Sequence, residues 1–432
     1  MKMKAAVEER KQGKTAQATA VAMQQLMLPL LIAVDATKKG LLAFVQQMGM
    51  LALSELLNNE AEMIAGPKGQ HARHRTHHYW GSATTTLPFG GRHVAVKRPR
   101  VRRRGRDGGE VELPSIEALR GADPMSLRVA EQIVIGVSTR GYDRSLDPVH
   151  EDLQTRGTSK SNASRALIDR TTQKLAEFVE RNLADLDLVA MFIDGIEIAK
   201  HTAIVALGVT SDGTKVPLGI WGGSTENAVV TTALLQNLVD RGLRVDHAML
   251  FVIDGGKGIR KALRDVFGDR AIVQRCQVHK TRNLRDHLPE ARRAYVARQM
   301  RDAYTSTSAA VAKKKLTQLA SWLESNGEDS AAASLREGLD ETLTTLRLKL
   351  PAGLCRTFST TNAIENMNGT LRRVMRNVKR WRDESMMRRW LALGIAEAQR
   401  GFRRVKGYRH MTALVAALRP ASAAVENEKQ VA

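Results

Sequence analysis

Hydrophobic and polar positions divide the chain into stretches of different periodicity. Residues 15–65 repeat apolar side chains at helical spacing and are rich in Met, Leu and Ala, which predicts two amphipathic helices suited to a core or a dimer contact. Residues 67–113 change to short alternating runs of Gly, His, Thr and Arg, which predict small β-hairpins. We therefore expect a helical or dimerisation region at 1–66 and a basic β-hairpin region at 67–123.

Residues 124–186 have the outline of a helix-turn-helix: a helix, a short helix, a turn and a long helix with a polar start. Many helical bundles share this outline, and Pro148 interrupts it. If the interpretation holds, the start of the long helix faces a DNA groove through Ser161, Asn162 and Arg165. This part would then be a mainly helical DNA-binding domain ahead of the rest of the chain.

From residue 187 the pattern becomes α/β. Three strands, a helix, a strand, a helix and a strand are predicted, in order, at 188–194, 201–213, 214–223, 226–242, 248–254, 258–268 and 271–276. The first three strands are expected to be antiparallel, and this order is that of a ribonuclease H-like fold. Residues 289–358 show only helical periodicity and interrupt the α/β domain (187–288) as a helical insertion. The domain resumes in the helices at 359–405, and a tail follows at 406–432.

Charge adds a partner to this outline. The chain has 432 residues and a formal net charge of +22, an excess that favours a polyanion such as nucleic acid over a basic surface without a partner. The charge is clustered in the β-hairpin region, where it either tracks a phosphate backbone or belongs to a solvated linker. The arginines concerned are Arg98, Arg100, Arg102, Arg103, Arg104 and Arg106.

The two cysteines, Cys276 and Cys355, exclude a disulfide framework and fit a reducing cytoplasm. The apolar stretch at 26–34 is too short to span a bilayer, and we expect no signal peptide. The histidines in the β-hairpin region offer a metal site only as a minor alternative, because no cysteine or acidic residue lies near them. They are His71, His74, His77 and His78.

Two predicted strands end in the same way, in Ile-Asp-Gly at Asp194 and at Asp254. Ligand sites in open α/β sheets lie at the carboxyl ends of strands, so neighbouring parallel strands would bring both carboxylates to one edge. Such a pair repels itself and attracts a divalent cation, and two cations of this kind serve phosphodiester chemistry. The alternative is that each aspartate only caps the turn before its glycine.

A third carboxylate is then expected, and Glu197, Glu226 and Glu365 are the candidates. Glu365 starts a helix in which Asn362 would be the cap, so it could equally close a capping box. Gly369 follows it by one turn, where a ligand could approach closely. The residues alone leave capping and catalysis equally open. Two weaker patterns are Cys276-x-x-His279, which lacks a second pair for a zinc site, and residues 254–258, which fail as a phosphate-binding loop because Ser/Thr is missing.

Together these motifs resemble the mutator-type transposases of bacterial insertion sequences. The resemblance spans about 90–405 and rests on 194–195, 254–259, 275–283 and 360–368. It implies a ribonuclease H-like fold with a helical insertion, a catalytic and metal-binding triad of Asp194, Asp254 and Glu365, and two Mg²⁺ ions that Mn²⁺ could replace. Cys276 and His279 would be a signature close to that triad. Where Ala363 stands, family members commonly carry proline.

The resemblance also implies DNA strand cleavage, transfer of the 3′-OH to target DNA, and at least a dimer on the element's terminal inverted repeats in the bacterial nucleoid. Further candidate DNA contacts are Lys257, Lys280, Arg282, Asn283, Trp322, Arg372, Arg373 and Arg376. Trp322 would stack on a flipped base, as in related transposases, or else belong to a core. Two alternatives remain: an inactive DNA-binding regulator derived from a transposase, and a ribonuclease H-type or junction-resolving nuclease.

Overall fold

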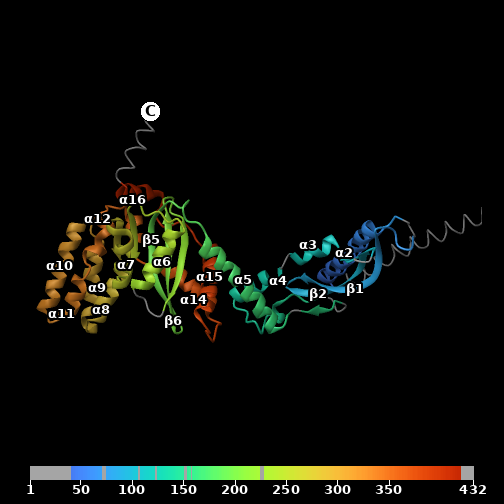
Figure 1. The fold of residues 1–432 in the computed structure, drawn as a ribbon. Helices are drawn as coiled ribbons and strands as arrows, with labels where there is room; N and C mark the ends of the chain where they lie inside the picture. The colour runs from blue at the N-terminus through green and yellow to red at the C-terminus, as the bar shows by residue number, and fades with distance from the viewer. Residues whose placement is uncertain are drawn as a thin grey trace, which may run out of the picture. The chain divides into compact units, whose positions relative to one another are not determined.

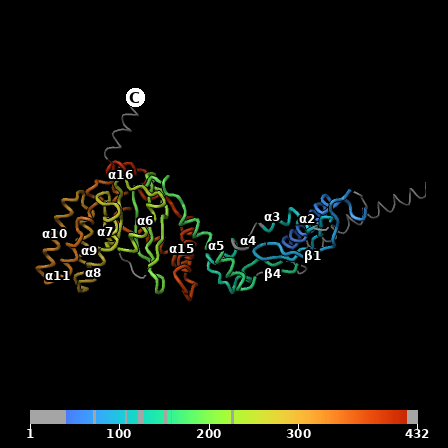
Figure 2. The backbone as a smooth tube through the Cα atoms, in the orientation of Figure 1, coloured from blue at the N-terminus to red at the C-terminus, as the bar shows by residue number. Residues whose placement is uncertain are grey.

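The computed structural model describes residues 40–70, 74–105, 108–121, 124–149, 153–156, 158–223 and 228–419. The chain divides into two compact units, the first ending at Leu167 and the second beginning at Ile168, except that Val134–Gly136 groups with the second. Figures 1 and 2 follow the chain through both units.

The first unit is built on one long hairpin rather than several small ones. Its strands pair antiparallel from Phe89 opposite Arg92 to His77 opposite Arg103, with a bulge between Tyr79 and Ser82. The tight connection falls at Gly90 and Gly91, whose φ angles of +55° and +84° suit a two-residue turn that favours glycine. The elements of this unit are α2 (Leu41–Ala65), β1 (His77–Phe89), β2 (Arg92–Arg103), β3 (Glu110–Val111), α3 (Pro114–Gly121), α4 (Pro124–Val134) and β4 (Thr155–Arg156).

Helix α2 covers the hairpin. Leu57, Ala61 and Ala65 of the helix share a core with Val94 and other apolar residues of β2. By length and composition α2 could also cross a membrane, with 11% of its most apolar stretch buried. We interpret it as a packed surface helix, because the buried Glu60 carboxylate on the same helix accepts a 2.5 Å hydrogen bond from the Ser115 hydroxyl at the start of α3.

The helix-turn-helix predicted at 124–186 is wrong in that form. After α4, the short second helix is a 3₁₀ turn at Asp143–Ser145, and the long helix α5 (Lys160–Glu180) begins only after strand β4. That strand pairs with β2 of the hairpin. The segment between the helices is therefore part of a sheet, which a three- or four-residue turn does not allow. The first unit therefore combines the predicted helices with a sheet formed by β1 to β4.

The second unit has the predicted order of strands and helices around one five-stranded sheet. The strand order is β7-β6-β5-β8-β9, with β7, β6 and β5 antiparallel and β5, β8 and β9 parallel. The elements are β5 (Leu188–Ile198), β6 (His201–Thr210), β7 (Lys215–Gly223), α6 (Ala228–Asp240), β8 (Met249–Ile253), α7 (Lys257–Phe267) and β9 (Ala271–Arg275). The two apolar strands that carry the candidate aspartates, β5 and β8, lie side by side as expected.

Side chains that alternate along the central strands contribute to two hydrophobic cores, one on each face of the sheet. Met191 and Ile193 of β5 pack with α6 and α7 on one face of the sheet. Phe192 and Ile196 pack on the other face, with the helices that end the chain. Because side chains alternate along a strand, Asp194 belongs to the same face as Phe192, and Asp254 to the same face as Val252. Both aspartates therefore lie on the side of the C-terminal helices.

Residues after β9 form helices only, among those the structure describes, and Figure 1 shows α8 to α11 gathered beside the sheet. They have a core of their own, which includes Met300, Leu316 and Leu335. The chain then returns to the sheet with α14 and α15. These elements are α8 (Gln277–Asp286), α9 (Glu290–Tyr304), α10 (Ala309–Ser325), α11 (Asp329–Arg336), α12 (Thr344–Arg347), α13 (Ala352–Phe358), α14 (Asn362–Met375), α15 (Glu384–Arg400) and α16 (Met411–Leu418).

Candidate active site

Asp194 and Asp254 lie at the same edge of the sheet, as the sequence predicts. The parallel pairing of β5 and β8 ends with Ile193 opposite Ile253, so the two aspartates are the next residues on neighbouring strands. Strand β5 continues beyond Asp194 only through its antiparallel pairing with β6. The first strand therefore ends at Ile198 and not at Asp194 as predicted, and only its parallel pairing with β8 stops before Asp194.

The environment of Asp194 disfavours its charge. Burial, followed by the nearby Asp254 carboxylate, raises the pKa of Asp194 to about 6; His279 opposes this shift and Glu365 adds to it. These influences bring Asp194, Asp254, His279 and Glu365 into one electrostatic neighbourhood. The uncompensated negative charge is what a divalent cation would relieve.

Asp194 also has a hydrogen-bond donor that the sequence did not reveal. The Asn368 amide on α14 donates to Asp194 Oδ2 at 2.9 Å. Asn368 is 1% exposed, and its Oδ1 is buried with no partner among the described residues. A buried amide with one bond made and one oxygen free is costly unless a ligand or water completes it. Asn368 therefore holds Asp194 in place and offers a further oxygen close to it.

Asp254 has the turn-capping role that the sequence offered, and its metal-binding role stays a prediction. Its Oδ1 accepts a 2.9 Å hydrogen bond from the Gly256 amide, so it does fix the turn before α7. The following Gly255 has φ +110°, and a Cβ there would lie 2.0 Å from Nε of Arg275. Only glycine fits this close approach. Fixing the turn uses one carboxylate oxygen, and the second remains for a ligand.

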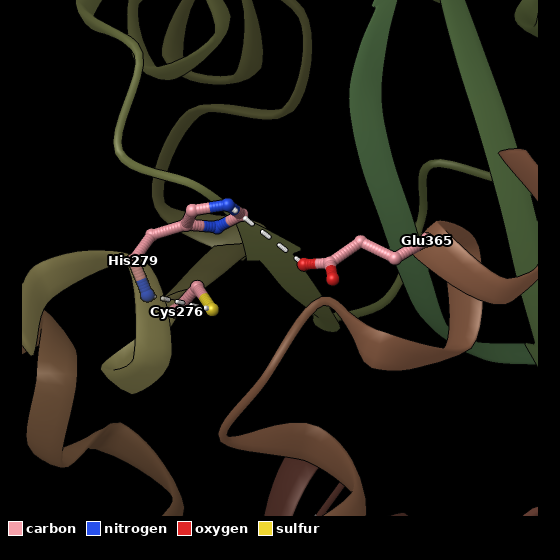
Figure 3. Close-up of side chains that lie close together, drawn as sticks. All are labelled: Cys276, His279 and Glu365. Carbon is pink, nitrogen blue, oxygen red and sulfur yellow. Dashed lines mark hydrogen bonds and ion pairs between the residues drawn. The ribbon is translucent and has the colours of Figure 1, made fainter. Parts of the chain in front are cut away.

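Glu365 faces Cys276 and His279 from another helix (Figure 3). Its Oε1 lies 3.8 Å from His279 Nε2 and accepts a 2.5 Å hydrogen bond from the Thr361 hydroxyl. The same hydroxyl lies 3.3 Å from His279 Nδ1 and 3.3 Å from Cys276 Sγ. Because a hydroxyl has one proton, the short bond to the carboxylate takes it, and the hydroxyl oxygen can accept from His279. Thr361 thus links His279 to Glu365.

The Cys276 thiol is a buried acceptor in this cluster. It caps α8 by accepting from the His279 amide at 3.5 Å, and it accepts from the Thr361 amide at 3.4 Å. Burial alone raises the pKa of Cys276, but the hydrogen bonds from His279 and Thr361 outweigh it and lower the pKa overall. The bond to Cys276 is also the largest influence that raises the pKa of His279, with smaller contributions from Glu365 and Asp254. Cys276 therefore connects the starts of α8 and α14.

The predicted capping box at Glu365 is wrong. Helix α14 begins at Asn362 and is preceded by Thr361, so the cap is one residue earlier than expected. In a capping box the glutamate would accept from the backbone amide of the cap residue. Here that amide, Thr361 N, donates to Cys276 Sγ instead. Glu365 is thereby left to face His279 and the sheet edge.

Of the other third-carboxylate candidates, Glu197 lies on β5 with an exposed side chain, and Glu226 lies outside the described residues. One group of potential metal ligands is present in the described chain, formed by Cys276, His279 and Glu365, whose ligand atoms lie within 4.8 Å of one another. The histidines of the hairpin region form no such group among the residues described, and His71 lies outside them.

The arginines of the hairpin differ in whether their guanidinium groups are free to contact DNA phosphates. Arg98 and Arg100 share the carboxylate of Glu110, at 2.9 Å and 2.7 Å. Arg102 lies over the ring of Trp80, 5.1 Å from its centroid. Arg103 and Arg104 are exposed, and no ion pair ties them to the described part of the chain. Arg106 lies outside the described residues. Of the arginines predicted to contact the phosphate backbone, only Arg103 and Arg104 are therefore both exposed and without an ion pair in the described chain.

Two candidate DNA contacts belong to the interior instead. Lys280 is 1% exposed, and its ammonium donates to the carbonyl oxygens of Ser334 and Glu337, the latter at 2.6 Å. Burial lowers its pKa to about 8. The prediction that Lys280 contacts DNA is wrong, because its charge is used to join α8 to α11. Trp322 packs on the helical core with its ring 4.7 Å from that of Tyr295, which favours the core alternative.

The remaining candidates are on the surface and stay predictions. Lys257 has a side chain that is 91% exposed and lies 4.0 Å from Glu337. Arg165 at the start of α5 donates to Asn162, so these two polar groups partly satisfy each other. The other exposed side chains of this set are those of Ser161, Arg282, Asn283, Arg372, Arg373 and Arg376.

Sequence reasoning missed two functional candidates, Thr361 and Asn368. A signal for Asn368 was present, since it is a polar residue among the buried positions Ile364, Met367 and Leu371 of one helix face. A polar group in such a stripe needs a partner. For Thr361 no comparable signal exists, because its contacts with Cys276 and His279 span more than 80 residues of sequence.

The second unit is thus a mixed α/β unit with acidic side chains at one sheet edge and a helix that brings a third carboxylate to it. A sequence model of the Mutator family of transposases matches residues 23–404, and the chain belongs to this family. The predicted family relationship is confirmed.

Individual relatives agree. The chain is 26% identical over 265 residues to the transposase of insertion sequence element IS905 of Lactococcus lactis, covering 59% of this chain and 64% of that protein. It is 30% identical over 220 residues to the transposase of ISRM3 of Rhizobium meliloti, covering 49% and 54%. It is 25% identical over 252 residues to the transposase of IS256 in Tn4001 of Staphylococcus aureus, covering 56% and 62%. Less than two thirds of each of these relatives is therefore matched.

Proposed function

We propose that this protein is a metal-dependent DNA transposase that cleaves the ends of its element and joins the freed 3′-OH to target DNA. The proposal rests on the family and on the placement of three carboxylates. Asp194 and Asp254 follow neighbouring parallel strands, and α14 brings Glu365 to the face on which both lie. The raised pKa of Asp194 indicates that the negative charge there lacks a counterion.

The second unit would be a ribonuclease H-like catalytic domain with a helical insertion. The strand order β7-β6-β5-β8-β9, three antiparallel and then two parallel, supports this proposal. So does the separate core of the helices between β9 and α14. The insertion would explain why Glu365 is 111 residues beyond Asp254 and still reaches the same sheet edge.

Asp194, Asp254 and Glu365 are the residues that would hold Mg²⁺, with Mn²⁺ as a substitute. The donor set fits, because these are carboxylate oxygens and the buried Asn368 Oδ1 next to Asp194 has no partner in the described chain. When bound, two such ions would activate the attacking oxygen and stabilise the leaving oxygen of a phosphodiester. Cys276 is better suited to structure than to Mg²⁺, since sulfur is a poor ligand for that ion.

The protein's own side chains would position the site. Asn368 holds Asp194 through the 2.9 Å bond, and Thr361 and His279 hold Glu365. In the first step water attacks phosphorus at the element end and gives up a proton, the bond from phosphorus to the 3′ oxygen breaks, and the leaving 3′ oxygen takes up a proton. In the second step the 3′-OH attacks a target phosphodiester and gives up its proton, a new P–O bond forms, and the bond from phosphorus to the target's own 3′ oxygen breaks as that oxygen takes up a proton.

The rest of the molecule would serve DNA binding. The net charge of +22 and the exposed Arg103 and Arg104 of the hairpin support binding of the terminal inverted repeats by the first unit. Because two ends must be joined, we propose a homodimer or higher oligomer on DNA. The protein would act in the bacterial cytoplasm at the nucleoid.

The test is cleavage and strand transfer on DNA carrying the element's own ends, in Mg²⁺ and in Mn²⁺. Asp254→Asn and Glu365→Gln are expected to lose both reactions by at least about a thousandfold, as removal of a metal-ligating carboxylate in a two-ion site removes most of its charge stabilisation. Glu197→Gln is the matched control, because Glu197 lies on the same strand as Asp194 but is exposed.

Three results would contradict the proposal, each in a different direction. Full activity in either carboxylate variant removes the assigned site. Sequence-specific binding that is indifferent to Mg²⁺, without cleavage by the native protein, identifies a regulator. Cleavage of branched DNA without strand transfer identifies a structure-selective nuclease.

A further inference from the structure

A pocket in the second unit lies next to the candidate active site, and none of Asp194, Asp254 and Glu365 lines it. Its volume is about 760 Å³, within the range of sites for small ligands. Gln277 and Ser359 line it, and the Gln277 amide donates to the Ser359 carbonyl at 2.9 Å. Cys276 and Thr361 of the candidate site are one and two residues away along the chain. A DNA strand bound in the candidate active site would therefore reach the pocket directly.

Four arginines from three helices line this pocket: Arg282 and Arg285 of α8, Arg301 of α9 and Arg356 of α13. All four are exposed. None of the described residues that line the pocket is acidic, and none of the four arginines is ion-paired within the described chain. Four like charges around one space repel each other unless an anion joins them.

Other arginines of the same helical region do have carboxylate partners. Arg292 lies 2.7 Å from Glu328, and Arg336 lies 2.8 Å from Glu324. Carboxylate partners are thus available to arginines of this region, although the exposed Arg298 of α9 also has no ion pair in the described chain. Four arginines without ion pairs in the described chain surround this one pocket. That arrangement indicates a ligand with phosphate groups, because the guanidinium fork matches phosphate geometry.

The rest of the lining suits a nucleotide. Hydroxyl groups come from Thr281, Ser306 and Thr360, and apolar surface from Val278 and Leu346, while Tyr304 adds an aromatic ring. Sugar and phosphate oxygens match the hydroxyls, and a base matches the apolar and aromatic side chains. A pocket of this size takes a single nucleotide unit rather than a base-paired duplex.

We propose that this pocket binds an unpaired nucleotide of the DNA strand, with its phosphates on the four arginines, beside the site of cleavage. The proposal rests on the transposase function proposed above and deepens it by naming where the strand continues. It differs from the expected stacking on Trp322, which packs in the helical core instead. A free mononucleotide offers the same chemistry, but a strand supplies several linked phosphates for the four arginines.

The test is fluorescence anisotropy of a short labelled oligodeoxythymidylate with the full-length protein in EDTA. Arg301→Ala is expected to weaken binding about tenfold and to lower the slope of log Kd against log salt by about 0.7, the value for one phosphate contact on a single strand. Arg298→Ala is the matched control: Arg298 is exposed on the same helix one turn earlier and does not line the pocket. It should change binding less than twofold.

A second variant tests the space without changing charge. Ala352 is exposed at the pocket, and Ala352→Trp is expected to weaken oligonucleotide binding about tenfold by filling it. Equal effects of Arg301→Ala and Arg298→Ala, or unchanged binding by Ala352→Trp, would overturn the proposal. So would an equal loss by Arg301→Ala for duplex of the same length, which would make the pocket part of a general duplex surface.

Two further experiments distinguish a DNA strand from a free nucleotide as the ligand, and this inference from the proposed function. Deoxythymidine monophosphate should compete only at about a hundredfold higher concentration, since it carries one phosphate; equal affinity would replace the strand with a free nucleotide. Asp254→Asn should keep oligonucleotide binding in EDTA while it loses cleavage. Loss of pocket binding with intact cleavage sinks this inference alone, whereas pocket binding with no cleavage by the native protein sinks the proposed function alone.

Discussion

Asn368 illustrates how a single amide can orient a carboxylate of the candidate active site. It lies one turn beyond Glu365 on α14, and it donates to Asp194 on the central strand at 2.9 Å. One helix thus supplies the third carboxylate and orients the first. The orientation matters because Asp194 is crowded by Asp254 and Glu365, and a carboxylate under such repulsion turns away unless a donor holds it.

We expect Asn368→Ala to lower the cleavage rate about 10- to 100-fold, the usual cost of removing a group that orients a metal ligand. Asn368→Asp should cost more, because it places a further carboxylate against Asp194. Asn366→Ala is the control, since Asn366 is exposed on the same helix. Cleavage is measured against Mg²⁺ concentration, and the Asn368→Ala defect should shift the Mg²⁺ dependence to higher concentration. An unchanged Mg²⁺ dependence would contradict an orienting role.

Asp194 should also make the stability of the metal-free protein depend on pH. The pKa of about 6 in the folded protein is above the ordinary aspartate value of 3.8, so the folded state holds the proton more tightly than the unfolded state. Its contribution to stability is complete below pH 3.8 and is lost as pH rises to about 6. The shift corresponds to about 3 kcal/mol, and solvent screening at this half-buried side chain reduces it to about 1–2 kcal/mol.

Urea unfolding in EDTA between pH 5 and 7 isolates this effect when the native protein is compared with Asp194→Asn. The variant cannot carry the charge, so its advantage in unfolding free energy should grow across that pH window. A difference that stays constant with pH would show that the Asp194 carboxylate is not repelled. Saturating Mg²⁺ should stabilise the native protein more at pH 7 than at pH 5, since the ion competes with the proton.

Helix α14 has one buried face and one exposed face. Ile364, Met367 and Leu371 bury one side against the sheet, while the side that carries Gly369 is exposed. A Cβ at Gly369 would meet no atom within 4 Å. The glycine is therefore not required by packing, although it weakens the helix.

Gly369→Ala is accordingly expected to raise the free energy of unfolding by about 0.5–1 kcal/mol. Urea denaturation measures this gain, and a destabilised variant would show that the backbone at this position needs glycine. If cleavage falls while stability rises, the strand approaches α14 closely at this position. Asn366→Ala on the same exposed face controls for the change of surface.

Under the proposed function, the distribution of charge over the molecule would govern how tightly the protein binds DNA. In the hairpin, Arg98 and Arg100 are tied to Glu110, whereas Arg103 and Arg104 are exposed without an ion pair in the described chain. Only cations that neutralise phosphates contribute to salt-dependent binding. The formal net charge of +22 therefore overstates the number of charges that act on the duplex.

Replacing Arg103 and Arg104 together with alanine is expected to lower the slope of log Kd against log salt for duplex DNA by about 2, at about 0.9 for each contact. The matched control is Arg98→Ala with Arg100→Ala, which removes the same charge from the same strand but should lower the slope by less than about 1, because both are paired with Glu110. Equal slopes for the two double variants would contradict the prediction that Arg103 and Arg104 contact phosphates while Arg98 and Arg100 do not.

Much of this molecule follows from local sequence. The order of strands and helices around the five-stranded sheet was predictable, because side-chain periods of 2 and 3.6 already mark which faces are buried. The end of the strand before Asp254 was equally predictable, whereas the first strand continues past Asp194 to Ile198. The charge and the cysteine content predict a nucleic-acid partner and a reducing compartment, and both stay predictions.

The failures share a physical cause. The helix-turn-helix expected at 124–186 was lost to a strand that pairs with the hairpin, and Lys280 was buried by carbonyl groups of α11. Asn368 and Asp194 meet across 174 residues of sequence. Periodicity tells which side of an element is buried, but not which element covers it. Long-range packing decides the partners of polar groups, and with them the site.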